Sequence, residues 1–265
     1  MSEASELRGA CAEAARLGGE VLRQRFGGRR TIDYKGGIDL VTDADRASEE
    51  ALLAFLRRRH PDAAILAEES GASGDAAAAL RFVVDPLDGT TNYAHGLPHF
   101  AVNVAALDSG GVVAGATYDP VRDEMFLAAR GAGASLGDDA IRVSRTPELQ
   151  RAMLCTGFPY DVHQNHEMPL RIFGEYVRRA RAIRRMGSAA LDLAYVACGR
   201  FDGFWEARLK PWDLAPGVLL VREAGGSCAD FDGGDAILER GEVCAANLDL
   251  QPRLLAVLAD VRRSR

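Results

Sequence analysis

The segment that most constrains this chain is DPLDGTTN (residues 85–92), which directly follows the apolar run RFVV (residues 81–84). A short apolar run bounded by turn residues predicts a buried strand, and proline followed by Asp-Gly is favourable turn chemistry. The same residues place two carboxylates, Asp85 and Asp88, at a strand end, where α/β folds assemble ligand sites. The segment is therefore either a plain turn or part of a cation and phosphate site.

Other acidic residues also follow predicted strands or begin a predicted helix. Glu68 follows the run AAILA, and Asp213 follows Lys-Pro-Trp, whose proline indicates a helix start. If these acids converge, each pair about 4 Å apart repels by roughly 4 kcal/mol at an effective dielectric constant of about 20. A few such pairs would offset most of a domain's net stability of about 5–15 kcal/mol. The cluster therefore requires protons or cations, and a donor set of oxygen atoms favours Mg²⁺ or Mn²⁺ over Zn²⁺.

Two nearby features are relevant to phosphate binding and to the orientation of an attacking water. Gly89 lets the backbone approach a ligand, and a helical turn beginning at Thr90 would aim its N–H groups at a phosphate. Upstream, Thr42-x-x-Asp45 matches a capping box at a helix start. The spacing alone favours a capping role for Asp45, and the alternative is that its carboxylate orients an attacking water.

Composition argues against several classes of protein. The net charge of −6 argues against a broad nucleic-acid footprint. The acidic N-terminus does not match a signal peptide, and no run of about 18 apolar residues predicts a membrane span. Five scattered cysteines without a C-x-x-C pair argue against a disulfide framework or a zinc knuckle. We therefore expect a cytoplasmic protein without membrane contacts.

Hydrophobic periodicity predicts a layered α/β chain without internal repeats. The predicted helices cover residues 5–26, 43–60, 167–182, 189–198, 211–224 and 250–261, and an antiparallel β meander covers residues 100–143. We expect a single domain over residues 1–265. Its N-terminal α+β half (1–145) would carry most of the metal ligands, and its C-terminal α/β half (146–265) would carry Asp213 and the contacts to the substrate ring.

Taken together, the motifs resemble the inositol monophosphatase family. The resemblance is carried by residues 85–92, by Glu68-Glu69-Ser70 and by Pro211-Trp212-Asp213, with further matches at residues 39–45, 187–190 and 223–226. It extends from the first predicted helix to Asn247. The resemblance implies a five-layered αβαβα sandwich, a homodimer, and lithium-sensitive hydrolysis of phosphate monoesters with two or three Mg²⁺ ions, which Mn²⁺ could replace.

The resemblance also implies roles for individual residues. One metal ion would be held by Glu68, Asp85 and the Leu87 carbonyl, and a second by Asp85, Asp88 and Asp213. Thr90, paired with Asp45, would activate the water, and the amides of Gly89 and Thr90 would bind the phosphate. Gly187, Ala189 and Glu206 match positions that contact the substrate ring.

The substrate stays open within this resemblance. Inositol 1-phosphate is the leading candidate, and fructose 1,6-bisphosphate, histidinol phosphate and a nucleotide phosphate are alternatives with the same chemistry. A different class of function is an RNA or transcription-complex binding module that uses the basic run 178–185. That run is otherwise a solvated helix face, a dimer contact or a grip on a second phosphate. His163 and His166 are interpreted as surface-loop residues rather than metal ligands.

Overall fold

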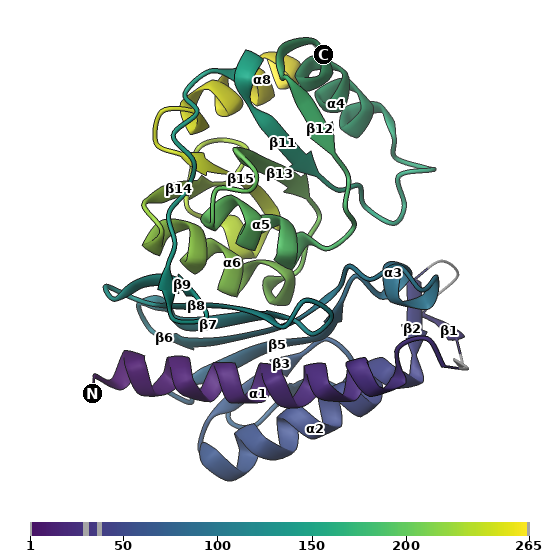
Figure 1. Cartoon of the computed structure of the whole chain (residues 1–265), viewed down its shortest axis with the longest axis vertical. Coiled ribbons are helices and arrows are strands. Elements are labelled where there is room, and N and C mark those ends of the chain that lie inside the picture. The colour runs from purple at the N-terminus through teal and green to yellow at the C-terminus, as the bar shows by residue number, and fades with distance from the viewer. Residues whose placement is uncertain (1, 29–31, 36–38, 264–265) are drawn as a thin grey trace.

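The computed structural model describes residues 2–28, 32–35 and 39–263, and its elements form five layers (Figure 1). From one end of the molecule to the other, these are a helix pair, a large sheet, a second helix pair, a smaller sheet and a third helix pair. The pairs are α1 (Glu3–Arg25) with α2 (Asp43–Arg59), α5 (Ala189–Ala197) with α6 (Pro211–Glu223), and α4 (Glu167–Arg179) with α8 (Gln251–Arg263). This αβαβα order confirms the predicted fold class. The short helices α3 (Thr90–Ala94) and α7 (Ile237–Arg240) lie outside these pairs.

The large sheet has eight strands in the order β10-β9-β8-β7-β6-β5-β3-β4. Their bounds are β3 (Ala64–Ala67), β4 (Gly71–Ser73), β5 (Arg81–Asp88), β6 (Ala101–Asp108), β7 (Gly111–Asp119), β8 (Glu124–Ala129), β9 (Gly133–Leu136) and β10 (Asp139–Ala140). Strand β3 pairs in parallel with β5, and the other neighbours are antiparallel. The predicted meander is therefore the run from β6 to β10. A separate two-stranded ribbon joins β1 (Ile32–Lys35) and β2 (Asp39–Thr42).

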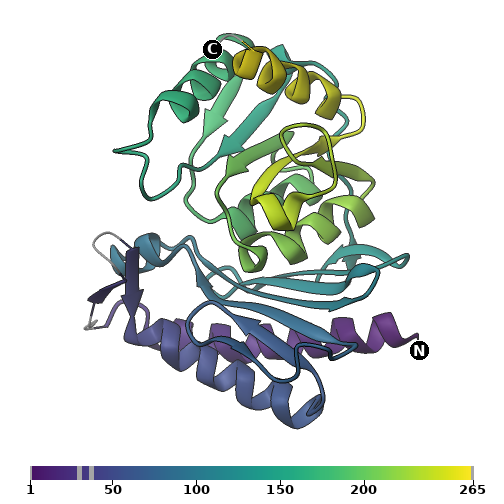
Figure 2. The same ribbon diagram turned by 180° about the vertical axis from the view of Figure 1, so that it is seen from behind.

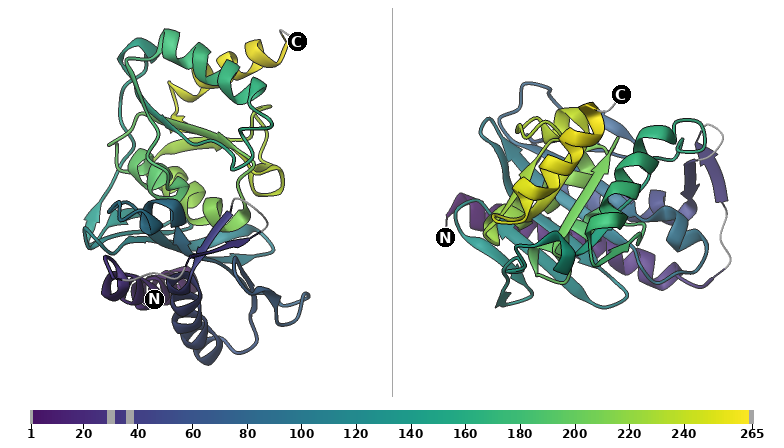
Figure 3. Two further views of the ribbon diagram at one scale, coloured as in Figure 1. Left: turned by 90° about the vertical axis from the view of Figure 1, so that its right-hand side faces the viewer. Right: turned by 90° about the horizontal axis from the view of Figure 1, so that it is seen from above.

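The smaller sheet has five strands in the order β12-β11-β13-β15-β14. Their bounds are β11 (Met153–Thr156), β12 (Ala182–Arg184), β13 (Gly203–Ala207), β14 (Gly226–Ala229) and β15 (Glu242–Asn247). Seen from above, α4 and α8 lie side by side across one face of this sheet (Figure 3). The other face packs against α5 and α6, which separate the two sheets.

Small side chains let the first helix lie close to its neighbours. A Cβ on Gly18 would lie 2.7 Å from the Ser48 hydroxyl of α2, and a Cβ on Gly19 would lie 2.4 Å from the Tyr118 ring of β7. Because real Cβ atoms do not approach so closely, glycine at these positions allows the close packing of this outer layer. Figure 2 shows α1 and α2 side by side on one face of the large sheet. This packing places the start of α2, which carries Asp45, beside the large sheet.

The basic run 178–185 does not lie on one helix, which argues against the solvated helix face among its alternative interpretations. Helix α4 ends at Arg179, three residues before the predicted end, and β12 begins at Ala182. Strand β12 pairs in parallel with β11, in the register Met153 to Ala182. The run therefore spans a helix end and an edge strand. In the described part of the chain, no helix combines the length and apolarity needed to cross a bilayer.

Candidate active site

The candidate site begins at an irregularity in β5. Asp85 pairs with Asn103 of β6 and Asp88 pairs with Ala101, so three steps along β5 match two along β6. In a regular strand, residues three apart point to opposite faces. The extra residue forms a bulge, which redirects the side chains around it, and Pro86, which has no N–H to donate to the ladder, lies within it. The bulge therefore lets both carboxylates face the same side of the sheet.

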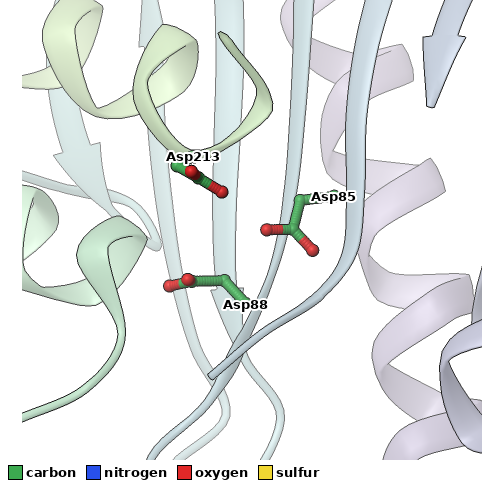
Figure 4. Close-up of side chains that lie close together, drawn as sticks. All are labelled: Asp85, Asp88 and Asp213. Carbon is green, nitrogen blue, oxygen red and sulfur yellow. The ribbon is translucent and has the colours of Figure 1, made fainter. Parts of the chain in front are cut away.

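Asp213 reaches the same space from the second half of the chain. Helix α6 begins at Pro211, and the Asp213 carboxylate accepts a hydrogen bond of 2.7 Å from the N–H of Lys210. This bond holds the side chain toward the start of the helix. Carboxylate oxygens of Asp85, Asp88 and Asp213 lie within 4.8 Å of one another, and the three side chains converge on one space (Figure 4).

Glu68 and Leu87 complete this acidic end of the site. The N–H of Glu68 donates to the Val84 carbonyl at 3.1 Å, which extends the parallel pairing of β3 with β5 by one residue. The Glu68 carboxylate lies close enough to Asp85 to contribute to its raised pKa. The Leu87 N–H donates to Asp85 Oδ1 at 2.9 Å, which fixes the orientation of that carboxylate.

Thr90 and Asp45 are in contact, as the resemblance implies. The Thr90 hydroxyl lies 3.2 Å from Asp45 Oδ1 and 3.0 Å from the Leu87 carbonyl. The other carboxylate oxygen of Asp45 accepts a hydrogen bond of 2.8 Å from the N–H of Thr42 and forms the capping box of α2. The two interpretations of Asp45 are therefore compatible, because each uses a different oxygen atom.

The second half of the chain holds the signature segment in place. The Asp88 carboxylate accepts hydrogen bonds from the Ser188 hydroxyl and from the Ala190 N–H (2.9 Å) at the start of α5. The amide of Asn92 donates to the Met186 carbonyl at 2.9 Å. The site is therefore assembled between the two halves, and its geometry depends on both.

Gly89 and Gly187 meet at this junction. Both have left-handed backbone conformations, with φ of 91° and 86°. A Cβ on Gly89 would lie 3.1 Å from the His99 carbonyl oxygen and 3.2 Å from that of Gly187. Because neighbouring backbone atoms cannot move away as a flexible side chain can, the position favours glycine for conformation and for space.

A cavity of about 910 Å³ opens over these residues. Every predicted site residue except Asp45 lines it: Glu68, Asp85, Leu87, Asp88, Gly89, Thr90, Gly187, Ala189, Glu206 and Asp213. Asp45 lies behind the wall and contacts the cavity through Thr90. Cationic side chains line other parts of the wall, from Arg185, Arg208, Lys210 and Arg240.

Burial makes the carboxylates of the site weak acids. It raises the pKa of Asp85 well above its ordinary value, and the nearby charges of Glu68, Asp88 and Asp213 add to the increase. Burial raises the pKa of Asp88 to about 6, although its hydrogen bonds from the Ser188 region oppose this, and it raises the pKa of Asp213 to about 8 with a contribution from Asp88. At neutral pH the raised pKa values of Asp85 and Asp213 favour binding of a proton or a cation at these two carboxylates.

The donor set fits a hard divalent cation. The converging side chains of Asp85, Asp88 and Asp213 offer carboxylate oxygens, which suit Mg²⁺ and Mn²⁺. A cation would also neutralise the repulsion between charges that adds to the effect of burial on the pKa values of Asp85 and Asp213. Burial also raises the pKa of Asp45 to about 6. Asp45 does not belong to the carboxylate cluster, and its contact with the site is the hydrogen bond from Thr90.

Sequence reasoning missed two buried polar residues beside the site. Asn103 of β6 is completely buried, and its amide donates to the carbonyls of Trp212 (2.9 Å) and Asp213 (3.3 Å). Asp192 of α5 is buried beside the Cys155 thiol, and burial raises its pKa well above the ordinary value. The available signal was weak: each is a single polar residue within an otherwise apolar run.

Comparisons with known proteins agree with this geometry. A sequence model of the inositol monophosphatase family matches residues 3–263. Two relatives are the Nus factor SuhB of Pseudomonas aeruginosa, 46% identical with 86% of each chain covered, and the chloroplastic phosphatase IMPL1 of Arabidopsis thaliana, 42% identical with 93% of this chain and 68% of that protein covered. The solved structure of inositol monophosphatase from Anabaena superposes with a TM-score of 0.89 at 38% identity, covering 98% of this chain and 97% of that chain.

The match spans nearly the whole chain, and the family is generally metal-dependent, which agrees with the carboxylate cluster. The five-layered order of helices and sheets is the one that the resemblance implies. This chain belongs to the inositol monophosphatase family and is a phosphatase.

Proposed function

We propose that this chain hydrolyses the phosphate monoester of a small polyol or sugar in a Mg²⁺-dependent reaction, with inositol 1-phosphate as the leading substrate. The observation that carries the proposal is the convergence of Asp85, Asp88 and Asp213 within 4.8 Å beside the amides of Gly89 and Thr90. The lithium sensitivity, the homodimer, the cytoplasmic location and the single domain divided near residue 145 belong to the same proposal.

The proposed metal ligands are Glu68, Asp85, the Leu87 carbonyl, Asp88 and Asp213. Bound cations would lower the pKa of a coordinated water and neutralise charge on the phosphate oxygens. Phosphate monoesters hydrolyse so slowly in water that such stabilisation is essential. The cluster lies between the two sheets, where the second half of the chain can position the rest of the substrate.

Thr90 and Asp45 are proposed to orient the attacking water. The Thr90 hydroxyl donates to one partner and can accept from a water, while Asp45 accepts from Thr90 at 3.2 Å. Backbone N–H groups of Gly89 and Thr90 would hold the phosphate, because the start of a helical turn presents free N–H groups. Gly187, Ala189 and Glu206 would contact the polyol, and the buried Glu206 carboxylate is a suitable partner for ring hydroxyls.

The test is phosphate release from a panel of esters. Inositol 1-phosphate, fructose 1,6-bisphosphate, histidinol phosphate, a nucleoside monophosphate and p-nitrophenyl phosphate are each measured with Mg²⁺, and again after chelation. We expect the highest kcat/KM for inositol 1-phosphate and loss of all activity on chelation. Equal rates for inositol 1-phosphate and p-nitrophenyl phosphate would contradict the substrate, and activity unaffected by chelation would contradict the metal requirement.

The relatives named as Nus factors favour a second candidate function, binding within a transcription complex. The basic run 178–185 is the surface proposed for it. Labelled RNA and fluorescence anisotropy test this candidate with the Asp85→Asn variant. If the chain is bifunctional, this variant binds RNA with the affinity of the unchanged protein while its turnover is lost. Absence of RNA binding by the unchanged protein contradicts RNA as the partner.

A further inference from the structure

Helix α6, which carries Asp213, contains a proline in its second turn. Pro216 lies four residues after Trp212. In an α-helix, the carbonyl of each residue accepts the N–H of the residue four positions later, and proline has no N–H and crowds the carbonyl four positions before it. The Trp212 carbonyl, next to Asp213, therefore lacks its helical donor.

The missing donor comes from the large sheet. The side-chain amide of Asn103 on β6 donates to the Trp212 carbonyl at 2.9 Å and approaches the Asp213 carbonyl at 3.3 Å. The orientation of this amide is fixed from its other end, because Asn103 Oδ1 accepts a hydrogen bond of 2.6 Å from the Thr117 hydroxyl of β7. Asn103 and Thr117 are both completely buried, so water does not compete for these bonds.

Asn103 lies between Asp85 of the large sheet and the start of α6, which carries Asp213. In the strand register, Asp85 pairs with Asn103 and Asn103 pairs with Thr117, so the three side chains form one row across the same face of the sheet. Two residues along β7, a Cβ on Gly115 would lie 2.9 Å from the Pro216 Cα. The proline turn of α6 is thus in close contact with the sheet beside the row that contains Asp85.

We propose that Asn103 is a positioning residue for the metal site. Its amide replaces the hydrogen bond that Pro216 removes from α6, and it thereby fixes the first turn of that helix, with Asp213, at a set distance from Asp85. The inference rests on the proposed function, because the acids are treated as cation ligands. Asn103 touches neither substrate nor cation, and it acts through the backbone of Trp212 and Asp213.

The test measures Mn²⁺ binding without substrate, by electron paramagnetic resonance. We expect Asn103→Ala to raise the dissociation constant for Mn²⁺ about tenfold, the lower end of the range for residues that orient metal ligands. The rescue variant is Asn103→Ala with Pro216→Ala, because alanine at 216 restores an N–H for the Trp212 carbonyl. We expect its affinity to return to within about twofold of the unchanged protein.

Two single variants frame this effect. Pro216→Ala alone has both donors available and is the control, expected to bind Mn²⁺ within about twofold of the unchanged protein. Thr117→Val removes the bond that orients the Asn103 amide, so it is expected to weaken Mn²⁺ binding in the same direction as Asn103→Ala but by less. Unfolding temperatures in chelator are recorded for every variant. If Asn103→Ala does not fold, recovery of folding and binding in the rescue variant supports the inference, and failure to recover overturns it.

Other outcomes are equally decisive. Unchanged Mn²⁺ affinity in a folded Asn103→Ala protein overturns the inference, as does a rescue variant that binds as weakly as Asn103→Ala. Absence of Mn²⁺ binding by the unchanged protein overturns the proposed metal site, and this inference with it. Failure of the metal site is distinguishable from failure of the Asn103 inference alone, because it is seen in the unchanged protein without any variant.

Discussion

The two sheets contribute different chemistry to one cavity. The large sheet supplies Asp85 and Asp88 at the end of β5, and Glu68 directly follows β3. The smaller sheet supplies Glu206 on β13 and Gly157 directly after β11. The first set is a dense group of anionic oxygens, and the second set bounds the space beside it. Under the proposed function, the large sheet would therefore carry the reaction and the smaller sheet the selectivity.

Gly157 lies in tight contact with the Glu206 side chain of the smaller sheet. A Cβ on Gly157 would lie 2.2 Å from both carboxylate oxygens of Glu206. The absence of a side chain there is therefore what allows the Glu206 carboxylate to occupy its position. Variants in each sheet should consequently change different kinetic constants, and four predictions follow from this division in order of decreasing effect.

The largest effect is expected for Asp85→Asn in the large sheet. Asp85 contacts the other acids of the cluster, so losing its charge should weaken cation binding and lower kcat about 10³-fold for every ester, equivalent to about 4 kcal/mol of transition-state stabilisation. Initial rates over a range of Mg²⁺ concentrations measure it. The unfolding temperature in chelator should stay the same or rise, because a buried charge is removed. A loss of activity confined to polyol esters would contradict the assignment of the reaction to the large sheet and of selectivity to the smaller sheet.

Asp45→Asn should have the next largest effect. Removing a carboxylate that orients a water typically costs about 10²-fold or more in rate. The kcat for all esters should fall by about 10²-fold, while the Mg²⁺ concentration for half-activation stays within about twofold, because Asp45 lies outside the cluster. Asparagine retains an oxygen for the capping bonds to Thr42, so stability should change little. A large increase in the Mg²⁺ requirement would instead make Asp45 part of the metal site.

Gly157→Ala tests the smaller sheet. The new methyl group must displace the Glu206 carboxylate, so KM for the preferred polyol phosphate should rise about tenfold, or about 1.4 kcal/mol, with kcat for p-nitrophenyl phosphate unchanged. Gly174→Ala on helix α4 is the matched control, since a Cβ there meets only the end of the Arg178 side chain at 3.9 Å. Equal losses on both esters would show that Gly157 supports the whole site.

The smallest effect is a pH dependence of stability in chelator. Folding raises the pKa of Asp88 to about 6 and that of Asp213 to about 8, from ordinary values of 3.8. Between about pH 4 and 8 the folded state binds more protons than the unfolded state, so its stability falls as pH rises. We expect the unfolding temperature to drop by several degrees across this window, and Mg²⁺ to recover most of the drop at pH 8. A flat profile in chelator would contradict the pKa shifts.

Local patterns predicted most of the fold. The helices that became α1, α2, α5, α6 and α8 follow amphipathic or capped runs, and each lies within two residues of its predicted bounds. The signature segment was also local, because Asp85, Asp88, Gly89 and Thr90 are neighbours in sequence. Strand β12 was not predicted, because its arginine-rich sequence has no strand pattern of its own and depends on pairing with β11, about 29 residues earlier in the register.

The positions of the buried Asn103 and Asp192 could not be predicted for a related reason. Asn103 matters because of a proline in a helix more than 100 residues later, and no local pattern links the two positions. Asp192 lies in a short apolar helix, where its spacing is equally typical of a solvent-facing residue. Propensity and periodicity describe one element at a time, whereas the side chains of Asn103 and Asp192 contact residues of other elements.

The contact between Pro216 and Gly115 has a mechanical consequence. At this contact the backbone of α6 lies directly against that of β7, with no side chain on Gly115 between them. A shift of α6 along β7 would therefore bring other atoms into collision, because the interior is closely packed. This contact opposes sliding of α6 along β7 at one point of the junction between the two halves. We therefore expect the separation of Asp85 and Asp213 to stay nearly constant when a substrate binds.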